Sequence, residues 1–241
     1  MSQYFGKYLL SKWVYGYALP LKIVEKLALQ TEDELLHIGS GTGQTSLLIC
    51  RRFGCRVTGV ELSPQIVDVA SRRSAQKKLN KLVSFRFIDD ILKHARKYRR
   101  VFLESVLSYL ENPANLLNHV VDRGCRLGLL ELVWKTEPTS EDVLNASKVF
   151  GAAKFVETEH WKAFLHDCGF HVVDCGEEDL TLSRKLLDDL KISPTVTVRG
   201  IAASMFKALT VVEAREQLGL FLSFFRKLSR KMCCGYCIAD A

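Results

Sequence analysis

A glycine-rich turn is the part of this sequence whose residue types and spacing point most directly to chemistry. Gly39, Gly41 and Gly43 alternate with small polar residues directly after a short apolar run. Glycine lets the backbone turn sharply and lets a ligand approach it closely. A helix expected over residues 45–53 would present free N–H groups and its positive dipole end to this turn. The pattern therefore predicts a binding site for a ligand that carries a carboxylate or a phosphate.

Acidic residues close the next two expected strands. Glu61 ends the second strand, where a carboxylate can accept hydrogen bonds from both hydroxyls of a ribose. Asp89 or Asp90 ends the third strand, where an acceptor could bind an adenine amino group. A dinucleotide site fits less well, because Gln44 stands where the G-x-G-x-x-G fingerprint requires its last glycine. The combination predicts a ligand that contains a nucleoside.

The elements that must position these residues alternate between strands and helices. We expect strands over residues 35–38, 56–60, 83–88, 101–107, 127–133, 170–175 and 236–239, with helical segments in most of the intervals. Such alternation is typical of an α/β fold with a parallel sheet and helices on both faces.

We expect one domain with four parts. These are an N-terminal helical segment (1–30), a ligand-binding core (31–178), a helical cap (179–232) and a last strand (233–241). The cap is expected because its segment exceeds the usual length of a connection between strands and has helical periodicity. We predict that it closes a second pocket.

Several segments resemble the motifs of class I S-adenosylmethionine-dependent methyltransferases. Residues 35–43 look like the glycine-rich first motif, and residues 57–63 resemble the second-strand motif, whose acidic residue holds the ribose. The other resembling segments are residues 85–89 (third-strand motif), 104–109 (after the fourth strand), 123–131 (turn and fifth strand), and 159–161 and 168–170 (small-molecule branch).

The resemblance implies a Rossmann-like, mostly parallel seven-stranded sheet with a helical insertion before the last strand, and S-adenosyl-L-methionine as cofactor. It also implies a set of cofactor-binding residues: His37, Gly39, Ser40, Gly41, Gly43, Glu61, Leu62, Asp89, Asp90 and Glu104. The family often has an acidic residue where His37 stands, so contact with the amino group of the cofactor is expected to differ.

The reaction implied is in-line methyl transfer to a small-molecule or lipid-type acceptor. A general base is needed only if the acceptor does not readily lose its proton. Glu131 and His160 are the predicted catalytic residues. An RNA methyltransferase is an alternative because the net charge is +7, although no separate RNA-binding motif is visible. A non-catalytic protein that binds S-adenosylmethionine is a third interpretation, motivated by His37.

Composition bounds the compartment and the cysteine chemistry. The sequence has no run of about 18 uncharged apolar residues and no apolar segment of signal-peptide type at its start, so a cytoplasmic protein is expected. The eight cysteines are therefore expected to be buried thiols rather than disulfides. Cys234 and Cys237 have C-x-x-C spacing, but no second pair accompanies them, and no metal site is predicted.

Overall fold

The computed structural model describes residues 14–93, 97–151, 154–195, 197–198, 201–202 and 210–241. The chain forms two compact units. The core unit comprises residues 20–131, 158–176 and 235–241, and the helical unit comprises residues 1–19, 132–157 and 177–234.

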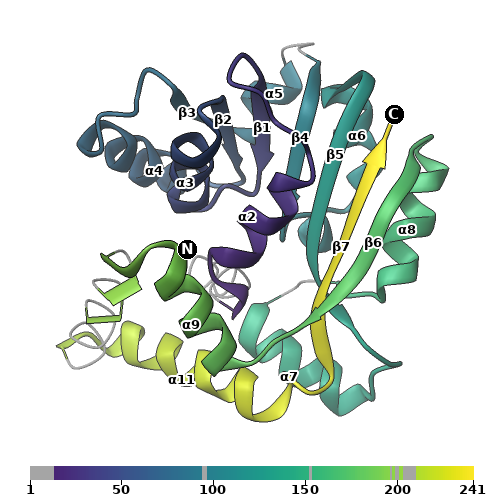
Figure 1. Ribbon diagram of the computed structural model, residues 1–241. Helices are drawn as coiled ribbons and strands as arrows, with labels where there is room; N and C mark the ends of the chain where they lie inside the picture. The colour runs from purple at the N-terminus through teal and green to yellow at the C-terminus, as the bar shows by residue number, and fades with distance from the viewer. Residues whose placement is uncertain (1–13, 94–96, 152–153, 196, 199–200, 203–209) are drawn as a thin grey trace. The chain divides into compact units, whose positions relative to one another are not determined.

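A seven-stranded sheet organises the fold. Its strands are β1 (Glu34–Ile38), β2 (Arg56–Glu61), β3 (Val83–Phe87), β4 (Tyr98–Glu104), β5 (Val121–Trp134), β6 (His171–Asp179) and β7 (Met232–Asp240). Their order is β3-β2-β1-β4-β5-β7-β6, and the first five strands of this order are parallel (Figure 1). Strand β7 runs antiparallel to β5, because Gly124 donates to Ala241 at one end and Lys135 donates to Lys231 at the other. The predicted fold class is confirmed.

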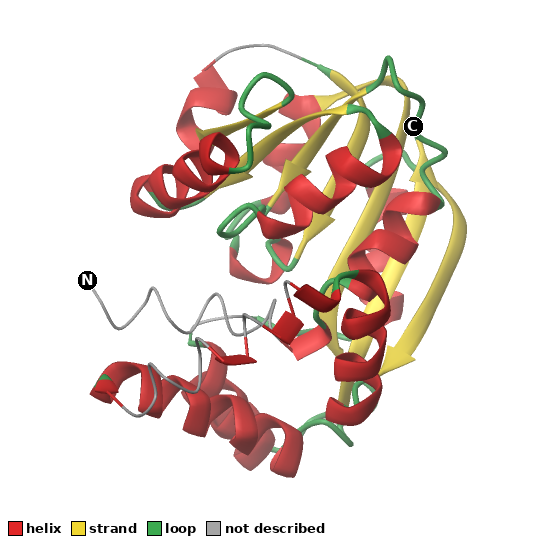
Figure 2. Ribbon diagram, turned by 60° about the vertical axis from the view of Figure 1, so that its left-hand side comes forward, coloured by secondary structure: helices red, strands yellow, loops and turns green. Residues whose placement is uncertain are grey.

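The strand order decides which face of the sheet each connecting helix of the core unit covers. They are α2 (Ala18–Glu25), α3 (Gln44–Phe53), α4 (Pro64–Gln76), α5 (Ile88–Lys93), α6 (Pro113–Val120) and α8 (Thr158–Asp167), with the 3₁₀ turn η1 (Leu107–Tyr109). The chain moves outward from β1 to β3 and then returns across the sheet to β4 and β5. Because such crossovers are right-handed, α3 and α4 cover one face, while α5 and α6 cover the other. Figure 2 shows the strands in yellow and the helices that pack along them in red.

Glycine allows α2 to approach the sheet closely. Gly128 of β5 lies opposite Phe102 of β4, and a Cβ at Gly128 would lie 3.3–3.4 Å from Ile23, Leu27 and Phe102. Ile23 and Leu27 are fully buried at this contact. Burial of each such side chain stabilises the fold by about 1.5–3 kcal/mol. Within the segment predicted as helical (1–30), the described residues are helical at 14–15 and over Ala18–Glu25, and residues 1–13 lie outside the described part.

The helical unit contains α7 (Ser140–Phe150), α9 (Leu182–Ile192) and α11 (Val212–Lys227). Phe150 of α7 packs edge-on against Phe224 of α11, with ring centroids 5.4 Å apart. Asp189 of α9 is buried, and its Oδ1 accepts hydrogen bonds from the N–H groups of Tyr17 (2.7 Å) and Ala18 (3.1 Å). Side chains on three separate chain segments therefore hold this unit together.

Strand boundaries differ from the sequence expectation where backbone geometry decides them. β4 covers Tyr98–Glu104 rather than 101–107, because Ser105 adopts a φ of 48° and the chain then turns into η1. Strand β5 begins at Val121, and β7 extends over Met232–Asp240 rather than 236–239.

One expectation about the cysteines is wrong. Cys175 of β6 and Cys237 of β7 form a disulfide, with their Cα atoms 4.2 Å apart. The two strands are neighbours in the sheet, and their pairing places these positions opposite each other. Periodicity within one strand contains no information about this register. Burial raises the pKa of the Cys55 thiol to about 11 and that of the Cys125 thiol to about 12, as expected of unreactive buried thiols.

Candidate functional site

The glycine turn, residues 39–43, lies where the strand order reverses. β1 is paired with β2 on one side and with β4 on the other, so the turn after β1 opens at the carboxyl ends of three parallel strands. Ligands of open α/β sheets bind in this position. Gly39, Gly41 and Gly43 have φ values of 80°, 57° and 82°, which side chains other than glycine rarely adopt. Gly43 caps α3 without a side-chain hydrogen bond, so the first N–H groups of the helix face the turn.

Glu61 connects β2 to the glycine turn. Its side chain is 1% exposed, Oε1 accepts the Gly41 N–H at 2.5 Å, and Oε2 accepts the Leu62 N–H at 3.0 Å. Ser40 is held from the same side, because its N–H donates to the Val60 carbonyl at 3.0 Å. The structure thus brings Glu61, Leu62 and the turn together, as the sequence predicts.

Two further residues shape the turn, and the sequence reasoning did not identify them. The Phe85 ring of β3 occupies the space that a side chain at Gly43 or Gly59 would need, since a Cβ there would lie 2.5–2.6 Å from its atoms. Arg73 of α4 donates to the Thr42 carbonyl at 2.9 Å and to Oγ1 of Thr42 at 2.7 Å. Arg73 has no motif around it, so only the packing of α4 reveals its role.

A buried polar chain lies beneath the turn. His37 of β1 is completely buried, and its Nε2 lies 2.7 Å from Oε2 of Glu104, which is 1% exposed. The other ring nitrogen, Nδ1, lies 2.8 Å from Oγ of Ser46 on α3. Glu104 is the last residue of β4, and a Cβ at Gly39 would lie 2.3 Å from its carbonyl oxygen. The chain therefore connects α3, β1 and β4 at the start of the turn.

Glu131, predicted as a catalytic base, is engaged by backbone and hydroxyl donors. Its Oε1 accepts the N–H groups of Val106 and Leu107, both at 2.7 Å, and its Oε2 accepts the Ser108 hydroxyl at 2.8 Å. The side chain is completely buried in β5. This geometry is that of a residue that holds the loop after β4.

The remaining predicted residues lie on exposed helix surfaces. Asp89 and Asp90 do not end β3, which stops at Phe87; both are exposed in the first turn of α5. The reason is that Ile88 already begins the helix. His160 is exposed on α8, and its ring lies edge-on against Trp161. Described residues of the chain contain no cluster of three or more His, Cys, Asp or Glu side chains that could hold a metal ion.

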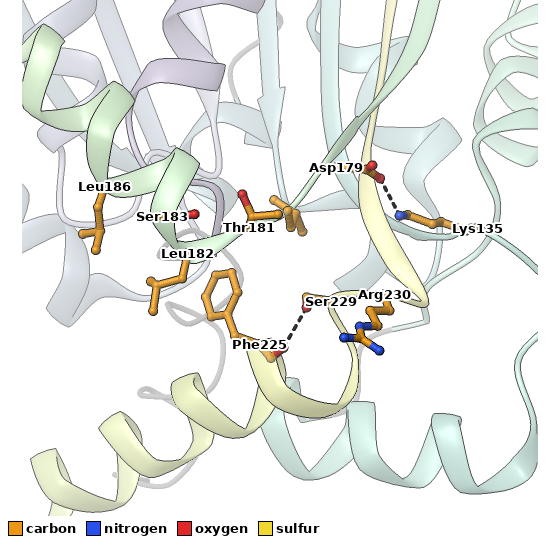
Figure 3. A pocket seen from close by; sticks show the side chains of 10 residues that line it. Lys135, Asp179, Thr181, Leu182, Ser183, Leu186, Phe225, Ser229 and Arg230 are labelled. Carbon is orange, nitrogen blue, oxygen red and sulfur yellow. Dashed lines mark hydrogen bonds and ion pairs between the residues drawn. The ribbon is translucent and has the colours of Figure 1, made fainter.

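A groove of about 740 Å³ lies in the helical unit between the first turn of α9 and the end of α11 (Figure 3). Its lining is largely apolar with hydroxyl and charged groups between: Lys135, Asp179, Leu180, Thr181, Leu182, Ser183, Leu186, Phe225, Ser229 and Arg230. Lys135 forms an ion pair with Asp179 and lowers the pKa of that carboxyl. The charge of Lys135 is thus balanced within the groove.

Both a family model and a curated relative that are similar to this chain are methyltransferases. A family model described as a methyltransferase domain matches residues 36–128, which include the glycine turn, Glu61 and Glu104. A curated O-methyltransferase of Pyrenophora dematioidea is 24% identical over 216 residues, which is 85% of this chain and 78% of the relative.

Two solved structures share the fold. The [4+2]-cyclase SpnF superposes with a TM-score of 0.68 at 19% identity, over 92% of this chain and 80% of the cyclase. Geranyl diphosphate C-methyltransferase from Streptomyces coelicolor, in complex with Mg²⁺, geranyl diphosphate and S-adenosyl-L-homocysteine, gives 0.66 at 18% identity, over 92% and 77% of the two chains. Because one of these proteins is a cyclase, the fold alone does not specify the reaction.

Proposed function

We propose that the chain is a class I S-adenosylmethionine-dependent methyltransferase that transfers the methyl group of S-adenosylmethionine to a small-molecule acceptor. The observation that carries the proposal is the junction of Glu61 with Gly41, which places a buried carboxylate against a glycine turn at the reversal point of the sheet. The O-methyltransferase relative supports the reaction class.

The residues at the turn fit this cofactor. Its carboxylate suits the N–H groups at the start of α3, its cationic amino and sulfonium groups suit the Glu104 carboxylate, and its ribose hydroxyls suit Glu61. Gly39, Ser40, Gly41, Gly43 and Leu62 would supply backbone groups around it. His37 lies completely buried behind Glu104, so we assign it no direct contact. Asp89 and Asp90 stand in the first turn of α5, where we propose that they bind the adenine amino group.

The protein's part in the reaction is positioning. When bound, S-adenosylmethionine supplies an electrophilic methyl group whose leaving group is a neutral thioether. The glycine turn and Glu61 hold the nucleoside end, and Glu131 fixes Val106 and Leu107 in the loop after β4. Such orientation lowers the barrier by restricting the reactants to an in-line geometry. We propose that Glu131 acts as a positioning residue, while a proton-accepting role for His160 remains a prediction.

We assign acceptor selection to the groove of the helical unit, whose lining residues other than Lys135 lie in the segment predicted as a cap (179–232). The leucine and phenylalanine side chains of its groove favour an acceptor with an apolar part. Phe225→Ala should lower kcat/KM for apolar acceptors about tenfold and leave cofactor affinity unchanged. Leu222→Ala is the matched control, because Leu222 is exposed on the same helix and does not line the groove. Equal effects of both substitutions would contradict the assignment.

A transfer assay separates this proposal from the alternatives. The protein is incubated with methyl-labelled S-adenosylmethionine and with panels of phenols, carboxylic acids, prenyl compounds and RNA. We expect label in a small molecule and formation of S-adenosylhomocysteine in equal amount. Label in RNA, with a steep loss of activity as salt rises, would favour the RNA methyltransferase. Cofactor binding without turnover on any acceptor would favour a non-catalytic protein.

A further inference from the structure

Ser46, His37 and Glu104 form the buried polar chain beneath the glycine turn. Of the three residues, only Glu104 is proposed to contact the cofactor. All three side chains are at most 1% exposed. Ser46 is completely buried on the side of the His37 ring away from Glu104, so its hydroxyl is not placed to act as the nucleophile of a hydrolytic triad. The polar chain can instead act through Glu104, the member that lies at the start of the glycine turn.

The sheet register explains how the chain is built. His37 of β1 lies opposite Phe102 of β4, and their rings are 5.1 Å apart. Side chains two residues apart in a strand share a face, so Glu104 lies on the same face as Phe102, one step nearer the glycine turn. Ser46 reaches His37 from α3, the helix that covers this face. His37 is thus placed by two strands and one helix.

The contact between His37 and Glu104 matters for stability because both side chains are buried. A carboxylate withdrawn from water is costly unless a donor compensates it. Nε2 of His37 lies 2.7 Å from Oε2 of Glu104 and can donate its N–H to that oxygen. On the other side of the ring, the Ser46 hydroxyl lies 2.8 Å from Nδ1 and fixes the rotation of the ring. Loss of the ring donor would remove a contact that fixes the orientation of the Glu104 carboxylate.

We propose that His37 is a positioning residue that holds the Glu104 carboxylate oriented toward the cationic aminoacyl end of S-adenosylmethionine, with Ser46 holding the ring. This inference rests on the proposed function, because it presupposes that the cofactor binds at the glycine turn. The carboxylate that attracts the cationic end comes from the end of β4, and β1 supplies its support.

The test compares two ligands that differ only at the end in question. S-adenosylhomocysteine carries the aminoacyl group, whereas 5′-methylthioadenosine has the same nucleoside and thioether without it. Affinities of both are measured by calorimetry. His37→Leu, which removes the donor, and Glu104→Gln, which removes the charge, should each weaken S-adenosylhomocysteine at least about tenfold and change 5′-methylthioadenosine by less than about twofold.

Conservative variants provide the control. His37→Gln retains an N–H donor near the position of Nε2 and should restore S-adenosylhomocysteine affinity to within about threefold of the wild type. Ser46→Ala should weaken S-adenosylhomocysteine selectively, whereas Ser74→Ala, at another buried serine whose hydroxyl bonds the Val83 carbonyl, should not.

Each outcome has a distinct meaning. Parallel loss of both ligands in His37→Leu and Glu104→Gln would show a merely structural role and overturn the inference, as would unchanged affinities in both. If His37→Leu does not fold, Glu104→Gln and Ser46→Ala decide by the same ratio. Failure of the wild type to bind either ligand would instead overturn the proposed function.

Discussion

Removal of the Glu131 side chain should cost stability rather than proton transfer. Three donors converge on this carboxylate, namely the N–H groups of Val106 and Leu107 and the Ser108 hydroxyl, at 2.7–2.8 Å. Glu131→Ala leaves all three without their acceptor in a completely buried site. At about 1–3 kcal/mol for each of the three unsatisfied groups, we expect a loss of about 3–9 kcal/mol. A domain is stable by only about 5–15 kcal/mol, so the loss is severe.

Glu131→Gln separates positioning from catalysis. The amide oxygen can still accept the Val106 and Leu107 N–H groups, and the Ser108 hydroxyl can rotate to accept from the amide nitrogen. We expect a cost of about 1–2 kcal/mol, because neutral acceptors bind more weakly than charged ones. Methyl transfer should stay within about tenfold of the wild type, whereas loss of a general base costs about 10²–10⁴-fold.

Urea unfolding and the transfer assay measure the two effects side by side. If Glu131→Gln abolishes transfer at unchanged stability, Glu131 is the base predicted from sequence and the positioning account is wrong. A loss of less than about 1 kcal/mol in Glu131→Ala would likewise refute the reasoning, since it would mean that the three donors find other acceptors.

Two further predictions concern the helical unit. Gly16→Ala should lower the unfolding free energy of this unit by at least about 2 kcal/mol in a urea titration. The reason is that Gly16 has a φ of 72° and a Cβ there would lie 2.3 Å from Oδ2 of Asp189. Gly219→Ala is the control, because Gly219 lies in α11 with open space around it, and it should be neutral or stabilising by about 0.5–1 kcal/mol. The hydrogen bond from Lys231 lowers the pKa of the Asp142 carboxyl to about 2. The stability that this contact adds is therefore present above the ordinary pKa of about 4 and is lost as the pH falls toward 2. Lys231→Met should raise the pKa of Asp142 in a carbon-13 NMR titration, and an unchanged pKa would contradict the assignment.

The part of the fold around the glycine turn can be predicted from sequence because its signals are local. The spacing of Gly39, Gly41 and Gly43 and the position of Glu61 at the end of a strand depend on backbone conformation within a few residues. The alternation of strands and helices along the chain, which predicts a parallel sheet, is likewise a local pattern.

Other features depend on partners distant in sequence. Glu131 looks like a candidate base until the loop after β4 is seen to donate to it. The Cys175–Cys237 disulfide and the contact of Arg73 with Thr42 arise from packing of elements that no local pattern links. Asp89 and Asp90 lie in the first turn of α5 rather than at the end of β3, because the helix begins at Ile88, directly after the strand.

The central claim is that S-adenosylmethionine binds at the glycine turn with Glu61 on its ribose. Titration calorimetry of S-adenosylhomocysteine into the wild type and Glu61→Ala tests it most directly, with NAD as the comparison ligand. We predict binding to the wild type, no binding of NAD, and a loss of about 1.5–3 kcal/mol in Glu61→Ala from the missing charge-assisted hydrogen bonds. Tight binding of NAD without a response to S-adenosylhomocysteine, or unchanged affinity in a folded Glu61→Ala variant, would contradict the account.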